Sequence, residues 1–197
     1  CWTRMSTSNA GWALFCVCMM KSCICLDHLT KRQVAVLKKI RILGIDPGYA
    51  IVGFGVLDYD GVNFSPIEYG AVLTEAGVPF PERLRAIHED IEFIFNKFKP
   101  DCMAIERLYF TSNQKTAIDV AQARGITVLS AAIRSVPVSE YTPLQVKLSV
   151  TGYGKAEKKQ VMEMTKSILG LAQIPKPDDA ADALAIAVCH GHTVRWQ

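Results

Sequence analysis

The sequence after Arg41 consists of short apolar runs followed by longer segments in which apolar residues have helical spacing. The runs at 41–46 and 51–58 are rich in Ile, Val and Leu. They flank a turn that contains Asp-Pro-Gly, so the pattern predicts two strands. A third strand is predicted at 67–74. Because no helical segment separates these three strands, we expect them to form a meander.

Helical periodicity begins after the third strand. Apolar residues between Leu84 and Phe98 recur at intervals of three and four positions, and Pro100 ends this predicted helix. Further along, the pattern predicts strands at 101–110 and 136–142 and helices at 113–135, 143–150, 156–169 and 178–192. A meander followed by strands that alternate with helices predicts an α/β fold, with a mixed five-stranded sheet flanked by helices.

Residues 1–40 differ from the remainder in charge and in cysteine content. They hold six basic residues against one acidic residue and five of the seven cysteines, whereas residues 41–197 hold 16 basic and 18 acidic residues. The apolar run at 11–20 is shorter than the ~20 residues that span a bilayer. The Cys-x-Cys pairs match no standard zinc pattern. We therefore expect a leader that is disordered or not native, followed by one domain at 41–197.

Several other patterns narrow the class of protein. Only Cys102 and Cys189 remain after the leader, which is too few for a disulfide framework and predicts a reducing cytoplasm without a membrane partner. The segment TGYGKAEK is not a Walker A loop, because Ser149 takes the place of its first glycine and Ala156 follows its lysine. The segment CHGH at 189–192 suits either a zinc site or a helix end with partly buried imidazoles.

Acidic residues stand at the ends of three predicted elements. Asp46 ends the first strand, Glu106 follows the apolar part of the fourth, and Asp178, Asp179 and Asp182 open the last helix. Taken singly, each suits a turn, a solvated strand end or a helix cap. Together they favour one site, because adjacent strands can bring their C-terminal ends to one place and residues 179 and 182 share a helix face.

This set of oxygen ligands suits Mg²⁺ or Mn²⁺, hard ions that prefer carboxylates and water and also bind phosphate oxygens. Two such ions ~4 Å apart would activate water and stabilise the leaving oxygen in phosphodiester cleavage. Gly44 and Gly48 lie beside Asp46 in the sequence. We interpret them as space for a phosphate backbone that approaches the chain closely.

Five ordered motifs give the chain a family resemblance. They are ILGIDPG, AIERLYF, AQARG, QVKLSVTGYGKAEKKQV and DDAADALAIAVCH, and they cover roughly residues 41–192. In this order and spacing they resemble the RuvC-type Holliday-junction resolvases, which have an RNase H-like fold. The resemblance implies that Asp46, Glu106, Asp179 and Asp182 are the catalytic carboxylates and that they bind the divalent metal, two ions per site.

The same resemblance assigns roles to basic and aromatic residues. It implies that Lys147 and Lys158 support catalysis or hold the junction backbone. Tyr109 matches an aromatic position that engages bases at the opened crossover, and Phe110 follows it directly. Stacking on a base suits either ring, and packing at a strand end suits both equally well.

Positive charge gathers in two segments near the predicted site. Residues 141–170 carry five lysines, Lys155 and Lys159 among them, against two glutamates. Residues 107–134 carry four basic residues against one acidic residue. We interpret these clusters as contacts to DNA phosphates, with a solvated helix face as the alternative for Lys155 and Lys159.

The resemblance implies a structure-selective endonuclease that resolves four-way DNA junctions in recombination and repair, leaving 5′-phosphate and 3′-hydroxyl ends. A four-way junction has two equivalent strands to cut, which favours a two-fold homodimer. The branch-migration motor RuvA–RuvB is the further partner that the resemblance implies. Two alternatives remain: a non-catalytic module that binds branched DNA, and an actin-like nucleotide-binding ATPase lobe, in which a strand–Asp–strand hairpin also cradles phosphates.

Overall fold

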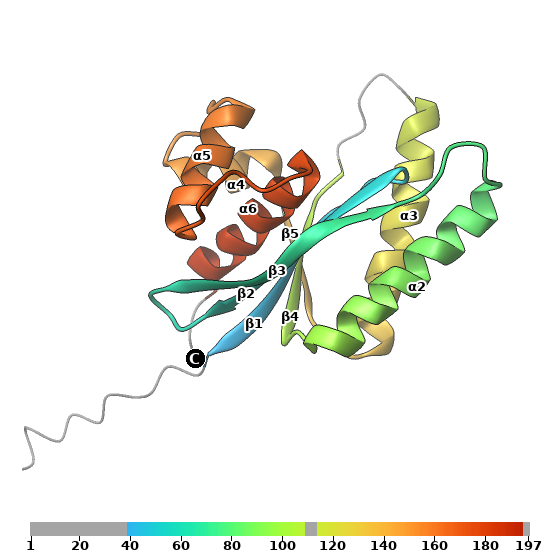
Figure 1. Ribbon diagram of the computed structural model, residues 1–197, viewed down its shortest axis with the longest axis horizontal. Coiled ribbons are helices and arrows are strands. Elements are labelled where there is room, and N and C mark those ends of the chain that lie inside the picture. The colour runs from blue at the N-terminus through green and yellow to red at the C-terminus, as the bar shows by residue number, and fades with distance from the viewer. Residues whose placement is uncertain (1–38, 109–113, 195–197) are drawn as a thin grey trace, which may run out of the picture. The chain divides into compact units, whose positions relative to one another are not determined.

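A five-stranded sheet forms the centre of the computed structural model, which describes residues 39–108 and 114–194 (Figure 1). Its strands are β1 (Ile40–Asp46), β2 (Ile51–Tyr59), β3 (Phe64–Leu73), β4 (Cys102–Glu106) and β5 (Val138–Tyr141). Their order across the sheet is β3-β2-β1-β4-β5. The first three strands are antiparallel, whereas β4 runs parallel to β1 and to β5. The predicted meander and mixed sheet are confirmed.

Five helices within the described residues lie in two groups, one on each face of the sheet (Figure 1). One group contains α2 (Phe80–Phe98) and α3 (Gln114–Ile133). The other contains α4 (Pro143–Thr151), α5 (Lys158–Ile168) and α6 (Asp178–Thr193). None of the helices in these described ranges is long and apolar enough to cross a membrane.

The strands and helices agree with the predicted ones, with ends that differ by a few residues. β3 begins at Phe64, earlier than predicted, because its pairing with β2 continues as far as Tyr59. β4 ends at Glu106, and the predicted strand residues Tyr109 and Phe110 lie outside the described part of the chain. The predicted leader also falls outside it, except for its last two residues, so its boundary stays a prediction.

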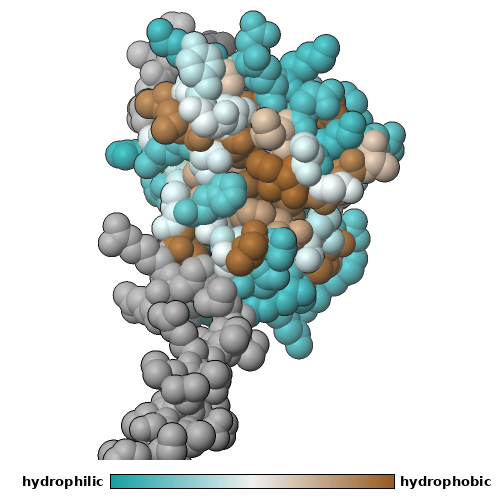
Figure 2. All heavy atoms as spheres, turned by 90° about the vertical axis from the view of Figure 1, so that its left-hand side faces the viewer, coloured by the Kyte–Doolittle hydropathy of each residue, from teal (hydrophilic) through white to brown (hydrophobic). Residues whose placement is uncertain are grey.

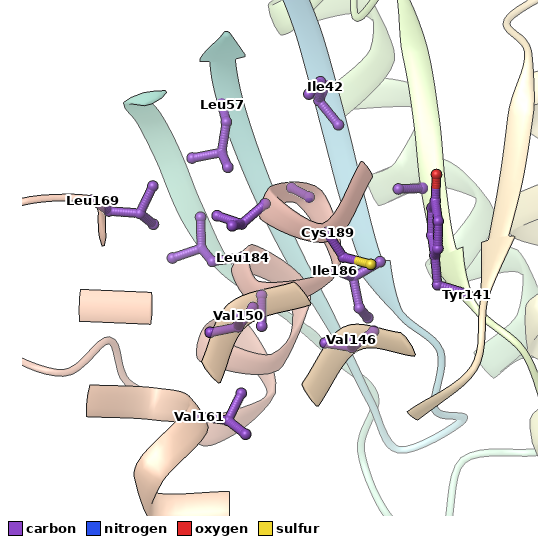
Figure 3. Packing of buried hydrophobic residues seen from close by; sticks show 14 of the residues in the cluster. Ile42, Leu57, Tyr141, Val146, Val150, Val161, Leu169, Leu184, Ile186 and Cys189 are labelled. Carbon is purple, nitrogen blue, oxygen red and sulfur yellow. The ribbon is translucent and has the colours of Figure 1, made fainter. Parts of the chain in front are cut away.

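Alternation along the strands gives the sheet a separate core on each face. Leu43 and Ile45 of β1 are fully buried and pack with apolar residues of α2 and α3. Ile42 points to the opposite face and packs with α6. Figure 3 shows α6 lying between the strands and α4, with Leu184 of α6 near the sheet and Val146 on α4.

Helix α6 approaches β1 so closely that there is no room for a side chain at Gly44. A Cβ atom built on Gly44 would lie 2.1 Å from the carbonyl oxygen of Ala183 in α6. A Cβ on Gly48 would lie 2.1 Å from the carbonyl oxygen of Ile51, within the turn between β1 and β2. Our interpretation of Gly44 and Gly48 as space for DNA is therefore wrong. The helix fills the space beside the first glycine, and the tight turn itself requires the second.

Helix α6 lies equally close to β2, which predicts a large loss of stability for Gly53→Ala. The added Cβ would lie 2.1 Å from the backbone oxygen of Asp179, so α6 must move and the core beneath it must loosen. We expect the free energy of unfolding, measured by urea titration with circular dichroism, to fall by roughly 1–3 kcal/mol. Gly70→Ala in β3 is the control, because its methyl meets only the ring of Phe54, at 3.0 Å. Equal losses for the two variants would contradict this account.

Candidate active site

Two carboxylates lie side by side where β1 and β4 end. The strands are parallel neighbours, with Ile45 opposite Ile105, so the residues that follow, Asp46 and Glu106, reach the same end of the sheet. Asp46 alternates with Ile45 and therefore points to the α6 face, as Glu106 does relative to Ile105. The prediction that these two acidic residues converge is confirmed, since both line one pocket.

The first turns of α6 bring two further carboxylates to this end of the sheet. Asp182 lines the same pocket as Asp46 and Glu106. Asp179, one turn earlier, is not among the residues that line it. Its backbone lies against Gly53, and its charge still contributes to the electrostatic environment of Asp46. Asp178 forms a 3.1 Å ion pair with the exposed Lys176 and stands apart from the pocket.

Two lysines complete the charged wall of the pocket. Lys147 reaches it from α4, whose first turn is held by a capping box between Thr142 and Gln145. Lys158 reaches it from the first residue of α5, and its Nζ lies 2.8 Å from an Oδ of Asp182. The ion pair raises the pKa of Lys158, so this side chain carries its full charge at neutral pH.

The grouped carboxylates repel one another. Burial, followed by the charges of Glu106, Asp182 and Asp179, raises the pKa of Asp46 to about 7, while Lys158 acts in the opposite direction. Burial and the charge of Asp182 also raise the pKa of Glu106. The pocket therefore holds more negative charge than its lysines offset.

The chemistry of this donor set fits hard divalent cations. Carboxylate oxygens are the ligands that Mg²⁺ and Mn²⁺ prefer, and a bound cation would relieve the repulsion that raises the pKa of Asp46. Within the described ranges, no three His, Cys, Asp or Glu side chains stand close enough together to form a metal cluster as they are. Asp182 is engaged by Lys158. Coordination by all four carboxylates thus requires side-chain rotation around the pocket.

Apolar residues to which no sequence motif assigns a role form the rest of the pocket lining. They are Pro143, Val146, Val161, Ala185 and Ile186. These residues carry no reactive group and occupy apolar positions of α4, α5 and α6, so nothing in their pattern separates them from ordinary core residues. This apolar lining lowers access of water to the carboxylates and explains why burial is the largest cause of the raised pKa of Asp46.

The other predicted residues have varied positions. Lys155, which precedes α5, and Lys159, in its first turn, are both exposed, as a DNA contact or a solvated face requires. In the predicted basic segment 107–134, Arg124 forms an ion pair with Glu140 and Arg134 forms one with Glu92. In these positions the two arginines support the fold, and contact of this segment with phosphates stays a prediction.

The CHGH segment forms the end of α6. Cys189 and His190 are buried, and His190 shares a 2.8 Å hydrogen bond with the hydroxyl of Tyr141. His192 lies 3.1 Å from the hydroxyl of Ser149. The helix-end interpretation therefore accounts for this segment.

The chain matches a family model over most of its length. The model is described as "Crossover junction endodeoxyribonuclease RuvC" and matches residues 42–190. The crossover junction endodeoxyribonuclease RuvC of Brevibacillus brevis is 56% identical over 151 residues, which cover 77% of this chain and 91% of that protein. Its counterpart in Ruminiclostridium cellulolyticum is 53% identical over 154 residues, 78% of this chain and 93% of that protein.

Solved structures agree with the fold. Thermus thermophilus RuvC in complex with Holliday junction substrate has a TM-score of 0.74 and 34% sequence identity, and the match covers 78% of this chain and 93% of that one. The five-stranded sheet flanked by helices is accordingly the RNase H-like fold that the motifs predict. The chain belongs to the RuvC family of crossover junction endodeoxyribonucleases.

Proposed function

We propose that this chain resolves four-way DNA junctions by cutting a phosphodiester bond in each of two strands, with divalent metal ions at the site built around Asp46. The observation that carries the proposal is the convergence of Asp46, Glu106 and Asp182 with two lysines in one pocket. Membership of the RuvC family supports it and does not favour the two alternatives, a non-catalytic DNA-binding module and an actin-like ATPase lobe.

The residues of the pocket divide the work of hydrolysis. Two Mg²⁺ or Mn²⁺ ions would be held by Asp46, Glu106 and Asp182 of the pocket together with the neighbouring Asp179, and they would activate water and neutralise charge on the leaving oxygen. Lys158 and Lys147 approach the pocket from α5 and α4 and hold the phosphate against the carboxylates. Attack of water on phosphorus breaks the bond to the 3′ oxygen and leaves 5′-phosphate and 3′-hydroxyl ends.

Two of the proposed DNA contacts, Lys155 and Lys159, belong to the side of the sheet that carries α4, α5 and α6. Figure 2 views this side of the molecule and shows hydrophilic residues around a central apolar area. Lys155 and Lys159 are exposed there and are proposed to contact backbone phosphates. Tyr109 or Phe110 is proposed to stack on a base at the crossover.

The proposed assembly is a two-fold homodimer, because the junction offers two equivalent strands. An exposed apolar stripe on α3 offers a surface for the second copy: Ile118, Leu129 and Ile133 are each more than half exposed. Gly125 lies between them, and a Cβ added there meets no atom within 4 Å, so packing within the described chain does not require glycine. Close approach of a helix from the second copy would require glycine at this position.

The family assignment also supports proposals about the partner protein and the cellular location. RuvA–RuvB, a branch-migration motor, is the proposed partner that delivers the junction. Cys102 and Cys189 are free and buried in the described structure. Two unpaired thiols fit a reducing compartment, which supports the proposed cytoplasmic location.

Replacement of Asp46 by Asn tests the proposal directly. The full chain with Mg²⁺ should make paired, symmetric nicks in a synthetic four-way junction and none in a linear duplex of the same sequence. Asp46→Asn should abolish the nicks, because the amide is a poorer metal ligand, while the affinity for the junction in a gel-shift assay stays within about threefold. Loss of binding together with cleavage would show misfolding or a binding role instead.

Lys158→Ala should lower the cleavage rate about 10- to 100-fold at saturating Mg²⁺, because a cation beside the reacting phosphate is lost. The matched control is Lys176→Ala, an exposed lysine that pairs with the neighbouring Asp178 outside the pocket. Single-turnover cleavage of the junction measures both. Equal rates for the two variants would place Lys158 among the solvated lysines.

The raised pKa of Asp46 predicts how stability depends on pH. Between the ordinary value of 3.8 and about 7, the folded state binds more protons than the unfolded state, so stability falls as pH rises through this range. Asp46→Asn should remove this loss and stabilise the metal-free protein at pH 8, on the order of 2 kcal/mol. The gain should vanish near pH 4.

Thermal unfolding in EDTA across this pH range measures the effect. Addition of Mg²⁺ at pH 8 should raise the melting temperature of the wild type more than that of Asp46→Asn, because the cation takes over the relief of charge. A variant that is less stable than the wild type at pH 8 in EDTA would contradict the repulsion we describe.

A further inference from the structure

The turn that follows Asp46 is tied to a distant part of the chain. Figure 1 shows the turn between β1 and β2 at the same end of the sheet as the connection from β3 to α2. The amide of Thr74, which follows β3, donates a 3.0 Å hydrogen bond to the carbonyl oxygen of Ala50. The hydroxyl of Thr74 donates a 2.7 Å hydrogen bond to the carbonyl oxygen of Tyr49. One residue therefore binds two consecutive carbonyls of the turn.

Arg83, in the first turns of α2, completes this contact. Its Nε and Nη2 donate hydrogen bonds of 2.9 and 2.8 Å to the hydroxyl oxygen of Thr74. A threonine hydroxyl has one proton to donate and two lone pairs to accept with, so the Thr74 hydroxyl is fully satisfied. Such a network is rigid, because no member can move without loss of a bond.

The guanidinium of Arg83 also packs on a side chain of the turn, Tyr49. Its central carbon lies 4.5 Å from the centre of the Tyr49 ring, a cation–π contact. Within the described ranges Arg83 has no acidic partner, unlike Arg85 on the same helix, which pairs with Glu89. The contacts that account for the place of Arg83 are thus those to the turn.

This network bears on the position of Asp46. Pairing of Asp46 with Gly53 holds the start of the turn, and Gly48 packs against the carbonyl of Ile51. Tyr49 also packs on the core, with its ring centre 6.4 Å from that of Phe80. The hydrogen bonds that hold the carbonyls of Tyr49 and Ala50, however, come from Thr74 and Arg83. A catalytic group needs support of this kind, because misplacement by about 1 Å can cost 100-fold in rate.

We infer that Thr74 and Arg83 are positioning residues for the proposed cleavage reaction: they hold the turn after Asp46 and thereby the Asp46 carboxylate, without contact to DNA. The inference rests on the proposed function and adds two residues that no motif marks. A role in DNA binding is the rival explanation for Arg83, so the test separates position from charge.

Thr74→Val is the decisive variant, because it removes the hydroxyl and changes neither charge nor size appreciably. We expect kcat for junction cleavage to fall roughly 10- to 100-fold with KM unchanged within about threefold. Thr74→Ser, which keeps the hydroxyl, should cleave within about threefold of the wild type. Hydrogen exchange of the segment 47–51, followed by mass spectrometry, should be faster in Thr74→Val than in Thr74→Ser.

Arg83→Met should lower kcat as Thr74→Val does, and the double variant should lose no more than either single one, because both break one network. Arg83→Lys keeps the charge but not the paired hydrogen bonds, and should restore little. Arg85→Met is the control on the same helix and should cleave normally.

Three results would overturn the inference. Wild-type kcat in Thr74→Val would remove any positioning role. Full rescue by Arg83→Lys, or a raised KM together with a shallower salt dependence of binding, would assign Arg83 to a phosphate instead. A wild-type chain that cuts no junction would refute the proposed function itself, and the positioning role with it.

Discussion

The close approach of α6 to the glycine-bearing face of β1 and β2 is the contact on which the rest of the structure depends. Gly44 and Gly53 let the helix backbone rest directly on the strands. The first turns of the same helix carry Asp179 and Asp182, and β1 ends at Asp46. The packing that closes this core therefore also sets how far apart the carboxylates stand, and neither can change alone.

This arrangement places like charges where the fold would be more stable without them. Burial and repulsion raise the pKa of Asp46, and the ion pair of Lys158 with Asp182 offsets only part of the excess charge. A protein tolerates such a site when packing of the surrounding core stabilises the fold by more than the repulsion destabilises it. Here two cores, one on each face of the sheet, provide that support.

Sequence reasoning was most successful where the signal was local or ordered along the chain. Strand ends at Asp46 and Glu106, and the helix that starts at Asp178, follow from apolar runs and spacing. It failed for Gly44, because a glycine shows that space is needed and not what fills it. It also could not identify the pairing of Arg124 with Glu140, or of Thr74 with the distant Tyr49, since such contacts depend on tertiary arrangement.

The position of α3 has a consequence for how this fold can vary. α3 lies on the opposite face of the sheet from the helices that line the pocket, so its outward surface shares no residue with the site. Substitutions on the outward surface of α3, where the second copy is proposed to bind, need no compensating change among the carboxylates. The strength of the proposed dimer could therefore change between related sequences while the pocket keeps the same chemistry.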